Sequence, residues 1–153
     1  MVARATLACT ALIVALAGCG GGSQEGEVTK TVRQWTATMA DQDGKAACAG
    51  MTAAAHAELA SFAQAYTKIP PTTVCAVNAT RFTHKLSSIA LRQMRDADVA
   101  DIEIDGSTAT VHMEDGGPNE LRLRREGDTW RIDRAFQKGW RLVGAPSFGM
   151  TGG

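Results

Sequence analysis

The sequence predicts an α+β fold in which N-terminal helices pack on an antiparallel sheet. Two observations lead to this prediction. Up to Asp96, apolar residues recur at the three- and four-residue intervals of amphipathic helices, and after it they alternate with polar residues. Short turns that contain glycine separate the alternating segments, which is typical of antiparallel hairpins. Because helices come first and strands second, the pattern favours α+β over an alternating parallel sheet.

The first predicted helix begins near Glu27 and ends at the turn residues 41–44. Its apolar residues lie at i, i+4, i+7 and i+11 and form one face: Val28, Val32, Trp35 and Met39. A second long helix is predicted between Thr52, a suitable N-cap, and Pro70, where paired prolines end it. The apolar face of this helix contains Leu59, Phe62, Ala63 and Tyr66.

A third helix is predicted between Arg81 and Met94, from the spacing of Phe82, Leu86 and Ile89. Four strands follow, in which these apolar residues alternate with polar ones: Ala100, Ile102 and Ile104; Ala109, Val111 and Met113; Leu121 and Leu123; Trp130 and Ile132. Turns are predicted at 105–106, 115–119 and 126–129, so consecutive strands pair as an antiparallel meander. Such a sheet has one apolar face and one charged, solvated face.

The N-terminal residues have the layout of a secretory signal. Arg4 supplies a positive start, and residues 5–17 form an uncharged apolar stretch, shorter than the about 20 residues that a membrane-spanning helix needs. Residues 16–18 before Cys19 resemble the lipobox of bacterial lipoproteins. The resemblance implies cleavage of a signal peptide at residues 1–18 and a diacylglycerol on the Cys19 thiol, whose two acyl chains suffice for stable anchoring. The alternative is an ordinary cleaved signal followed by an incidental cysteine.

The remaining cysteines predict one disulfide. Cys9 leaves with the signal and Cys19 carries lipid, so Cys48 and Cys75 are left to pair in an oxidising, exported compartment. Neither has a histidine or cysteine within a few positions that would complete a metal site. Between Cys19 and the first helix, the glycine-rich residues 19–26 are predicted to be a flexible tether.

The charge balance argues against a nucleic-acid partner. Sixteen basic and sixteen acidic residues cancel, and removal of Arg4 with the signal leaves 15 against 16. Proteins that bind nucleic acid present a strongly basic face, which this balance does not predict.

The order of elements, with several local phrases, resembles a nuclear transport factor two-like (cystatin-like cone, SnoaL-like) domain, in particular its small lipoprotein versions in high-GC Gram-positive bacteria. The resemblance is carried by the lipobox, the helix around Trp35, residues 43–48 with 51–52, Cys75, residues 102–106 with 109–111, and residues 126–133. It covers residues 27–133 and implies a curled sheet around a long helix, with a cone-shaped pocket. The domain is predicted to extend over residues 27–143. Residues 144–153 are predicted to be a loose tail, and Trp140 and Leu142 to form a further strand.

An enzyme of this family would hold a polar pair, often Asp with His, inside its pocket. The candidates for a general acid or base are His84, at the start of the third predicted helix, and Asp43. Asp41 and Asp43 lie at a helix stop, however, which favours turn and capping roles. We expect His56 to be packed beside an apolar stripe, and His112 to lie on the charged face of its strand. We predict neither a metal nor a cofactor, because no zinc-binding histidine pattern occurs.

Two further groups are candidates for binding. Aromatic residues on the apolar faces can line a ligand pocket, with core packing as the alternative: Trp35, Phe62, Tyr66 and Trp130. Arg122, Arg124 and Arg131 can form an anion patch on the outer face of the sheet. The simpler expectation is that these arginines pair across strands with the acidic residues predicted on the same face, namely Asp101, Glu103, Glu114, Glu120 and Asp133.

These observations favour a non-catalytic binding module, held by lipid on Cys19 at the outer face of the bacterial cytoplasmic membrane. Its ligand would be a small apolar molecule or another envelope protein. One alternative is a small-molecule enzyme of the cyclase or isomerase type, and another is an assembly module that forms a homodimer through the sheet face. Fold alone does not decide between them, because enzymes and binding modules share this architecture.

Overall fold

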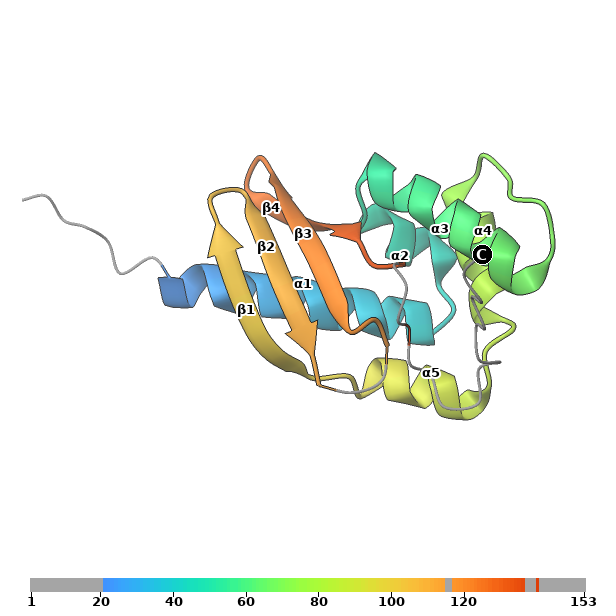
Figure 1. Cartoon of the computed structure of the whole chain (residues 1–153), viewed down its shortest axis with the longest axis horizontal. Helices are drawn as coiled ribbons and strands as arrows, with labels where there is room; N and C mark the ends of the chain where they lie inside the picture. The colour runs from blue at the N-terminus through green and yellow to red at the C-terminus, as the bar shows by residue number, and fades with distance from the viewer. Residues whose placement is uncertain (1–20, 115–116, 137–139, 141–153) are drawn as a thin grey trace, which may run out of the picture.

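The computed structural model describes residues 21–114, 117–136 and 140, and these form an α+β fold, as predicted (Figure 1). The predicted signal peptide, Cys19, Leu142 and the tail at 144–153 lie outside the described residues. The elements, in chain order, are α1 (Gly21–Ala40), α2 (Gly44–Ala49), α3 (Ala53–Thr67), α4 (Cys75–Thr83), α5 (Ser88–Arg95), β1 (Val99–Asp105), β2 (Thr108–Met113), β3 (Glu120–Glu126) and β4 (Thr129–Arg134). No helix within these ranges is long and apolar enough to cross a bilayer.

The four strands form one antiparallel sheet in the order β1-β2-β3-β4, which confirms the predicted meander. Two-residue turns join β1 to β2 and β3 to β4, and each needs a glycine because its first residue has a positive φ, 58° at Gly106 and 61° at Gly127. The long helix α1 passes behind the sheet, α5 packs against α1, and α2, α3 and α4 gather beyond one end of the sheet (Figure 1).

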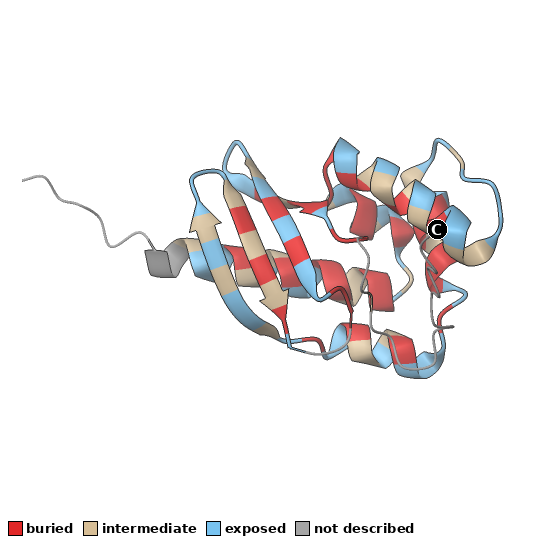
Figure 2. Ribbon diagram, in the orientation of Figure 1, coloured by how far each residue is buried: buried red, intermediate tan, exposed pale blue. Residues whose placement is uncertain are grey.

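The inner face of the sheet and the apolar face of α1 make the core, as the two periodicities predict. Figure 2 shows buried residues alternating with partly exposed ones along β2 and with exposed ones along most of β3. The predicted α1 face is buried at Val28, Val32, Trp35 and Met39. The inner face of the sheet is buried at Ala109, Val111, Leu121, Leu123, Trp130 and Ile132. Burying each large aliphatic side chain stabilises the fold by about 1.5–3 kcal/mol.

The third predicted helix is wrong: the segment forms two helices. Just after α4, the backbone makes hydrogen bonds between residues three apart, as in a 3₁₀ turn, and the Leu86 N–H donates to the Thr83 carbonyl oxygen. A new helix then begins because the Ser87 side chain accepts a hydrogen bond from the Ala90 N–H and caps α5. This restart rotates the buried face, so Ile89, which we predicted to be apolar core, is 53% exposed.

The predicted tether is also helical from Gly21 onward. Once Val28 and Val32 bury the first apolar positions of α1, additional residues extend the helix at its N-terminal end without a new nucleation step. Only Cys19 and Gly20 of the predicted tether at 19–26 fall outside the described residues.

Two β-bulges break the predicted alternation. Val99 pairs with Met113 and Asp101 with His112, so Ala100 is an extra residue, and it is exposed rather than on the apolar face. In β4 the partners of Leu123 and Arg122 are Ile132 and Arg134, which makes Asp133 the extra residue. Asp133 is only 4% exposed, although its carboxylate lies 3.5 Å from Arg124 of the outer face, so it is buried where the alternation predicts a solvated side chain.

Candidate functional site

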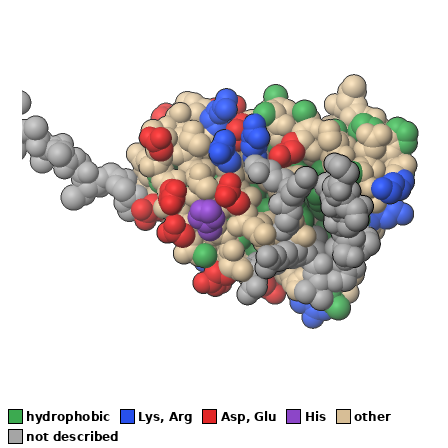
Figure 3. All heavy atoms as spheres, viewed as in Figure 1, with side chains coloured by type: hydrophobic (Ala, Val, Ile, Leu, Met, Phe, Trp, Pro, Cys, Tyr) green, Lys and Arg blue, Asp and Glu red, His purple; other side chains and the backbone are tan. Residues whose placement is uncertain are grey.

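The outer face of the sheet is divided by charge into columns that follow the strands. Two rows cross all four strands in the order acid, threonine, arginine, arginine: Glu103, Thr110, Arg122 and Arg134; Asp105, Thr108, Arg124 and Arg131. A third row is acidic around a histidine, with His112 between Asp101 and Glu120. Figure 3 views this face, with acidic side chains gathered toward β1 and Lys and Arg side chains toward β3 and β4. We call these eight residues of the first two rows the charge-segregated face.

The spacing of the strands keeps the two charges apart. Neighbouring strands lie about 4.8 Å apart, so the acidic column on β1 is about 10 Å from the first arginine column on β3. Cross-strand pairing was predicted between the outer-face arginines and five acids. Of these, only Asp133 pairs with an arginine, at 3.5 Å from Arg124, within the described ranges. Asp101, Glu103, Glu114 and Glu120 make no ion pair there.

Arg131 and Arg125 use acids from their own hairpin instead. Arg131 Nε lies 3.1 Å from the Glu126 carboxylate, and Arg131 also donates to the Ala49 carbonyl oxygen. Arg125 lies 3.8 Å from the Asp128 carboxylate. Exposed ion pairs of this kind contribute about 0–1 kcal/mol.

Arg122 and Arg134 are different, because they face each other. They are direct cross-strand partners, both are exposed, and neither side chain has a hydrogen-bond or ion-pair partner among the described residues. Like charges directly opposite each other destabilise a sheet. An external carboxylate can satisfy both guanidinium groups, since each presents a planar set of donors.

Asp133, which precedes Arg134 in the chain, joins the sheet to the helical end. Its buried carboxylate accepts a hydrogen bond of 2.9 Å from the Thr52 hydroxyl. Thr52 also accepts from the Ala55 N–H, which confirms it as the N-cap of α3. The Thr52 N–H donates to the Ile132 carbonyl oxygen, and the Ile132 N–H donates to that of Gly50. Residues 50–52 therefore cover the outer edge of β4, while β1 is the other end of the sheet.

The two candidate acid–base residues lie at helix ends on the surface. Asp43 is the N-cap of α2, and its carboxylate accepts a 3.0 Å hydrogen bond from the Ala46 N–H, as the capping interpretation predicted. It borders a shallow hollow of about 430 Å³ between α2 and α4, together with Lys45 and Arg81. His84 is exposed at the C-cap of α4, and it is not among the residues that line this hollow.

The four candidate ligand-binding aromatics divide between two places. Trp35 and Trp130 are fully buried, while Phe62 and Tyr66 are partly buried. Phe62 packs on Tyr66, at 6.5 Å between ring centroids. Burial raises the pKa of the Tyr66 hydroxyl above its usual value of 10.0, because desolvation disfavours the phenolate.

Three further aromatics join this group, and the sequence prediction missed them as a cluster: Phe82, Phe136 and Trp140. Phe82 lies edge-on to both Phe62 and Tyr66, at 5.3 Å from each. Phe136 stacks on Trp140 at 5.4 Å and lies edge-on to Trp35 at 5.9 Å. These rings pack directly against one another, which supports the core-packing alternative over a ligand pocket. Trp140 belongs to this cluster rather than to the further strand that was predicted.

Two buried indole N–H groups, on Trp35 and Trp130, have no acceptor among the described residues. Buried donors are normally paired. The Nε atoms of Arg125 and Arg131 are two further buried donors of this kind, and a water or a ligand oxygen could bind to any of them.

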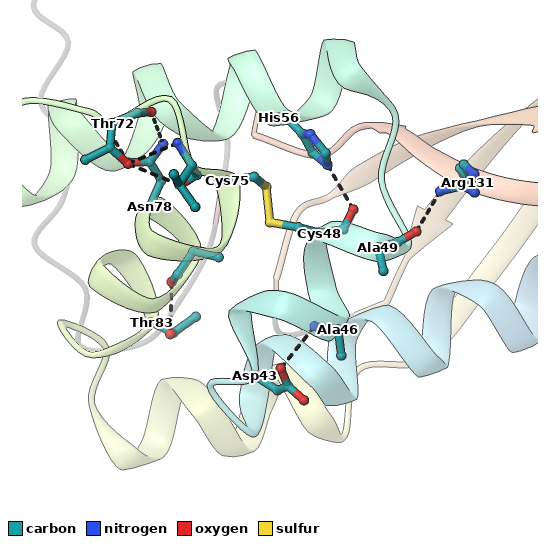
Figure 4. The surroundings of a disulfide bond; sticks show 12 residues. Asp43, Ala46, Cys48, Ala49, His56, Thr72, Cys75, Asn78, Thr83 and Arg131 are labelled. Carbon is teal, nitrogen blue, oxygen red and sulfur yellow. Dashed lines mark hydrogen bonds between the residues drawn. A yellow bond between two sulfur atoms is a disulfide. The ribbon is translucent and has the colours of Figure 1, made fainter.

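The predicted disulfide joins Cys48 to Cys75 and is confirmed. It ties the last turn of α2 to the first residue of α4, and His56 from α3 lies beside it (Figure 4). His56 Nε2 donates a 2.9 Å hydrogen bond to the Cys48 carbonyl oxygen, which agrees with the prediction of a packed histidine. His112 is half-buried on the outer face of β2, as its place in the alternation predicted.

Comparison of the chain with protein-family models, with curated proteins and with solved structures finds no match. The nuclear transport factor two-like resemblance and the lipobox therefore stay predictions.

Three of the face's arginines are predicted from the sequence, whereas Arg134, Thr108 and Thr110 are not predicted as parts of one surface. The two-residue turns after Asp105 and Glu126 carry most of the missing signal, because turn length sets the pairing register. Turn length does not predict the position of Arg134, because only the bulge at Asp133 brings Arg134 opposite Arg122.

Proposed function

We propose that the protein is a lipid-anchored lipoprotein of the bacterial envelope and acts as a non-catalytic protein-binding module through its charge-segregated face. The observation that carries this proposal is the pair of rows in which acid, threonine and two arginines follow one another across the sheet. Lipid on Cys19 would hold the domain at the outer face of the cytoplasmic membrane. We also propose that the folded domain is a nuclear transport factor two-like domain.

A protein partner fits this face better than a small molecule does. The face is a broad, open strand surface, whereas small ligands are usually enclosed by concave, largely apolar pockets. Arginine is enriched where protein interfaces gain most of their affinity, and complementary charge strips set the register of two surfaces. The packed aromatic cluster and the surface positions of Asp43 and His84 give less support to an interior ligand or to acid–base chemistry.

A second copy of the chain has charge strips in the complementary order. A twofold axis parallel to the strands would place β1 of one copy over β4 of the other, so Glu103 and Asp105 would meet Arg134 and Arg131. A twofold axis across the strands would instead oppose like columns. Closed twofold dimers are the commonest protein assemblies, so this arrangement is the second candidate within the proposal.

Site-specific photo-crosslinking in the native envelope tests the proposal. A photo-crosslinking residue replaces Thr110, at the centre of the charge-segregated face, and in a matched control it replaces Gln64, exposed on α3. We expect a defined protein adduct from position 110 and none from position 64. Adducts from both positions in equal yield, or from position 64 alone, would contradict the proposal.

A charge-swap experiment distinguishes the second copy from another envelope protein. One variant carries Glu103→Arg with Asp105→Arg, and the other carries Arg131→Glu with Arg134→Glu. If the partner is a second copy, each variant alone is a monomer in sedimentation velocity, and a mixture of the two restores the dimer. A monomeric wild-type protein that still gives a position-110 adduct in the envelope would identify a different protein as the partner.

A further inference from the structure

Three helices bring the side chains of Cys48, His56 and Cys75 together beside the disulfide (Figure 4). Cys48 is in the last turn of α2, His56 in the first turns of α3, and Cys75 at the first position of α4. The two sulfurs and a ring nitrogen of His56 all lie within 4.8 Å of one another. Cys48 is buried, whereas His56 and Cys75 are half-buried, so the cluster is open to solvent on one side.

We propose that reduction of the Cys48–Cys75 disulfide creates a Zn²⁺ site with Cys48, Cys75 and His56 as its protein ligands. A dithiol reductant supplies the two electrons: its thiolate attacks one sulfur, its second thiol resolves the mixed disulfide, and the reductant leaves as a disulfide. Zn²⁺ then binds the two sulfurs and displaces their protons to solvent. Water takes the fourth position on the open side of the cluster.

The distances fit a tetrahedral zinc site. With Zn–S bonds of about 2.3 Å and Zn–N bonds of about 2.0 Å, neighbouring ligand atoms lie about 3.5–3.8 Å apart. One ring nitrogen of His56 lies no more than 4.8 Å from the sulfurs, so a small movement of the side chain brings the imidazole to this spacing. Opening the disulfide lets the sulfurs separate to it.

The imidazole of His56 is also held as zinc-bound histidines usually are. Its Nε2–H donates to the Cys48 carbonyl oxygen at 2.9 Å, and because a carbonyl only accepts, Nε2 carries the proton. The lone pair of the neutral ring is then on Nδ1. Zinc-bound histidines typically donate their other N–H to a carbonyl or carboxylate in this way, which fixes the ring toward the metal.

The surroundings keep the reduced cysteines close together. Gly44 packs so tightly on α4 that an added Cβ would lie 2.4 Å from the Ala76 carbonyl oxygen, so α2 and α4 are in direct backbone contact. Cys75 is the first residue of α4, so this backbone contact also fixes the distance between the two cysteines.

The test is a Zn²⁺ titration of the full chain with and without a phosphine reductant. All samples carry Cys9→Ser and Cys19→Ser, so that Cys48 and Cys75 supply the only thiols. A chromophoric chelator competes for the metal, and circular dichroism follows folding. We expect one Zn²⁺ per reduced chain, an unfolding midpoint that rises with added Zn²⁺, and no binding by the oxidised chain. His56→Ala is expected to weaken Zn²⁺ binding at least tenfold, while the matched control His84→Ala leaves it unchanged.

Each other outcome overturns the proposal. Equal Zn²⁺ binding by the reduced and oxidised chains would place the metal elsewhere. Unchanged affinity in His56→Ala would leave only a thiol pair without the proposed third ligand. If reduction unfolds the chain, Zn²⁺ must refold it; a chain that binds Zn²⁺ but stays unfolded would also contradict the site.

Discussion

The helical end of the molecule and the outer face of its sheet are built in opposite ways. At the helical end, α2 and α4 are joined by a disulfide and by the close approach at Gly44, and the buried Asn78 side chain holds the loop at Thr72 through both its donor and its acceptor. On the sheet, β1 has no buried residue, and Arg122 and Arg134 oppose each other unpaired. The helical end is thus cross-linked and closely packed, whereas the outer sheet face keeps an unfavourable pair of like charges. Under the proposed function, this charge is kept for an interaction.

The largest expected effect is on the aromatic cluster. Phe82→Ala removes a fully buried ring that contacts Phe62, Tyr66, Phe136 and Trp140. If the cluster is core, the free energy of unfolding falls by about 3–5 kcal/mol. Urea denaturation measures the change, with Ile89→Ala, at an exposed apolar position, as a control expected to stay within about 0.5 kcal/mol. A loss below about 1 kcal/mol for Phe82→Ala would indicate that the ring lines a pocket and is not part of the packed core.

Removal of the disulfide comes next. Cys48→Ser with Cys75→Ser opens the loop between two cysteines that are 27 positions apart. The chain-entropy model predicts that the free energy of unfolding falls by about 3.5 kcal/mol. The same loss is expected when the wild-type protein is reduced in metal-free buffer, because both changes release the same constraint. Denaturation curves of the two samples that differ by more than about 1 kcal/mol would show that the serine substitutions act through packing rather than through the cross-link.

A matched pair of glycines sharpens the comparison further. Gly44→Ala drives a methyl group into the Ala76 carbonyl and the Thr80 hydroxyl, and we expect a loss of about 1–3 kcal/mol. Gly26→Ala, in α1, meets nothing within 4 Å and removes a flexible residue from a helix, so we expect a gain of about 0.5–1 kcal/mol. Thermal unfolding of both variants measures the two signs. Equal effects would mean that α2 and α4 are not in tight contact.

The smallest effect is on the sheet face, and it has the opposite sign. Arg122→Thr removes the like-charge pair with Arg134, which should raise the free energy of unfolding by about 0.2–1 kcal/mol at low salt. The gain should shrink at 1 M salt, where the Debye length is about 3 Å. The neighbouring control, Arg124→Thr, should instead destabilise, because Arg124 is paired with the buried Asp133. Destabilisation by Arg122→Thr would show that the arginine pair supports the fold.

The sequence predicts the α+β class and the inner face of the sheet well, because each core residue repeats a single local rule. Val28, Val32 and Trp35 follow the helical period, and Leu121 and Leu123 follow the strand period. The bulges at Ala100 and Asp133 could not be predicted this way. An extra residue is visible only in the pairing with a neighbouring strand.

The candidate sites were harder to predict because they depend on contacts between elements. His56 follows Cys48 by eight positions, and only the packing of both α2 and α3 on α4 brings its ring to the disulfide. The break in the third predicted helix did have a local signal, since Ser87 is a good N-cap residue.

The most direct test of the account reverses the charge of the unpaired arginines and follows binding and stability together. Arg122→Glu with Arg134→Glu is combined with the photo-crosslinking residue at position 110, and the adduct yield in the envelope is measured beside the unfolding midpoint of the purified protein. The account predicts that the position-110 adduct is lost while the midpoint stays within a few degrees of the parent. An undiminished adduct, or a midpoint that falls as far as that of the disulfide variant, would contradict the division between a stabilising helical end and an interacting sheet face.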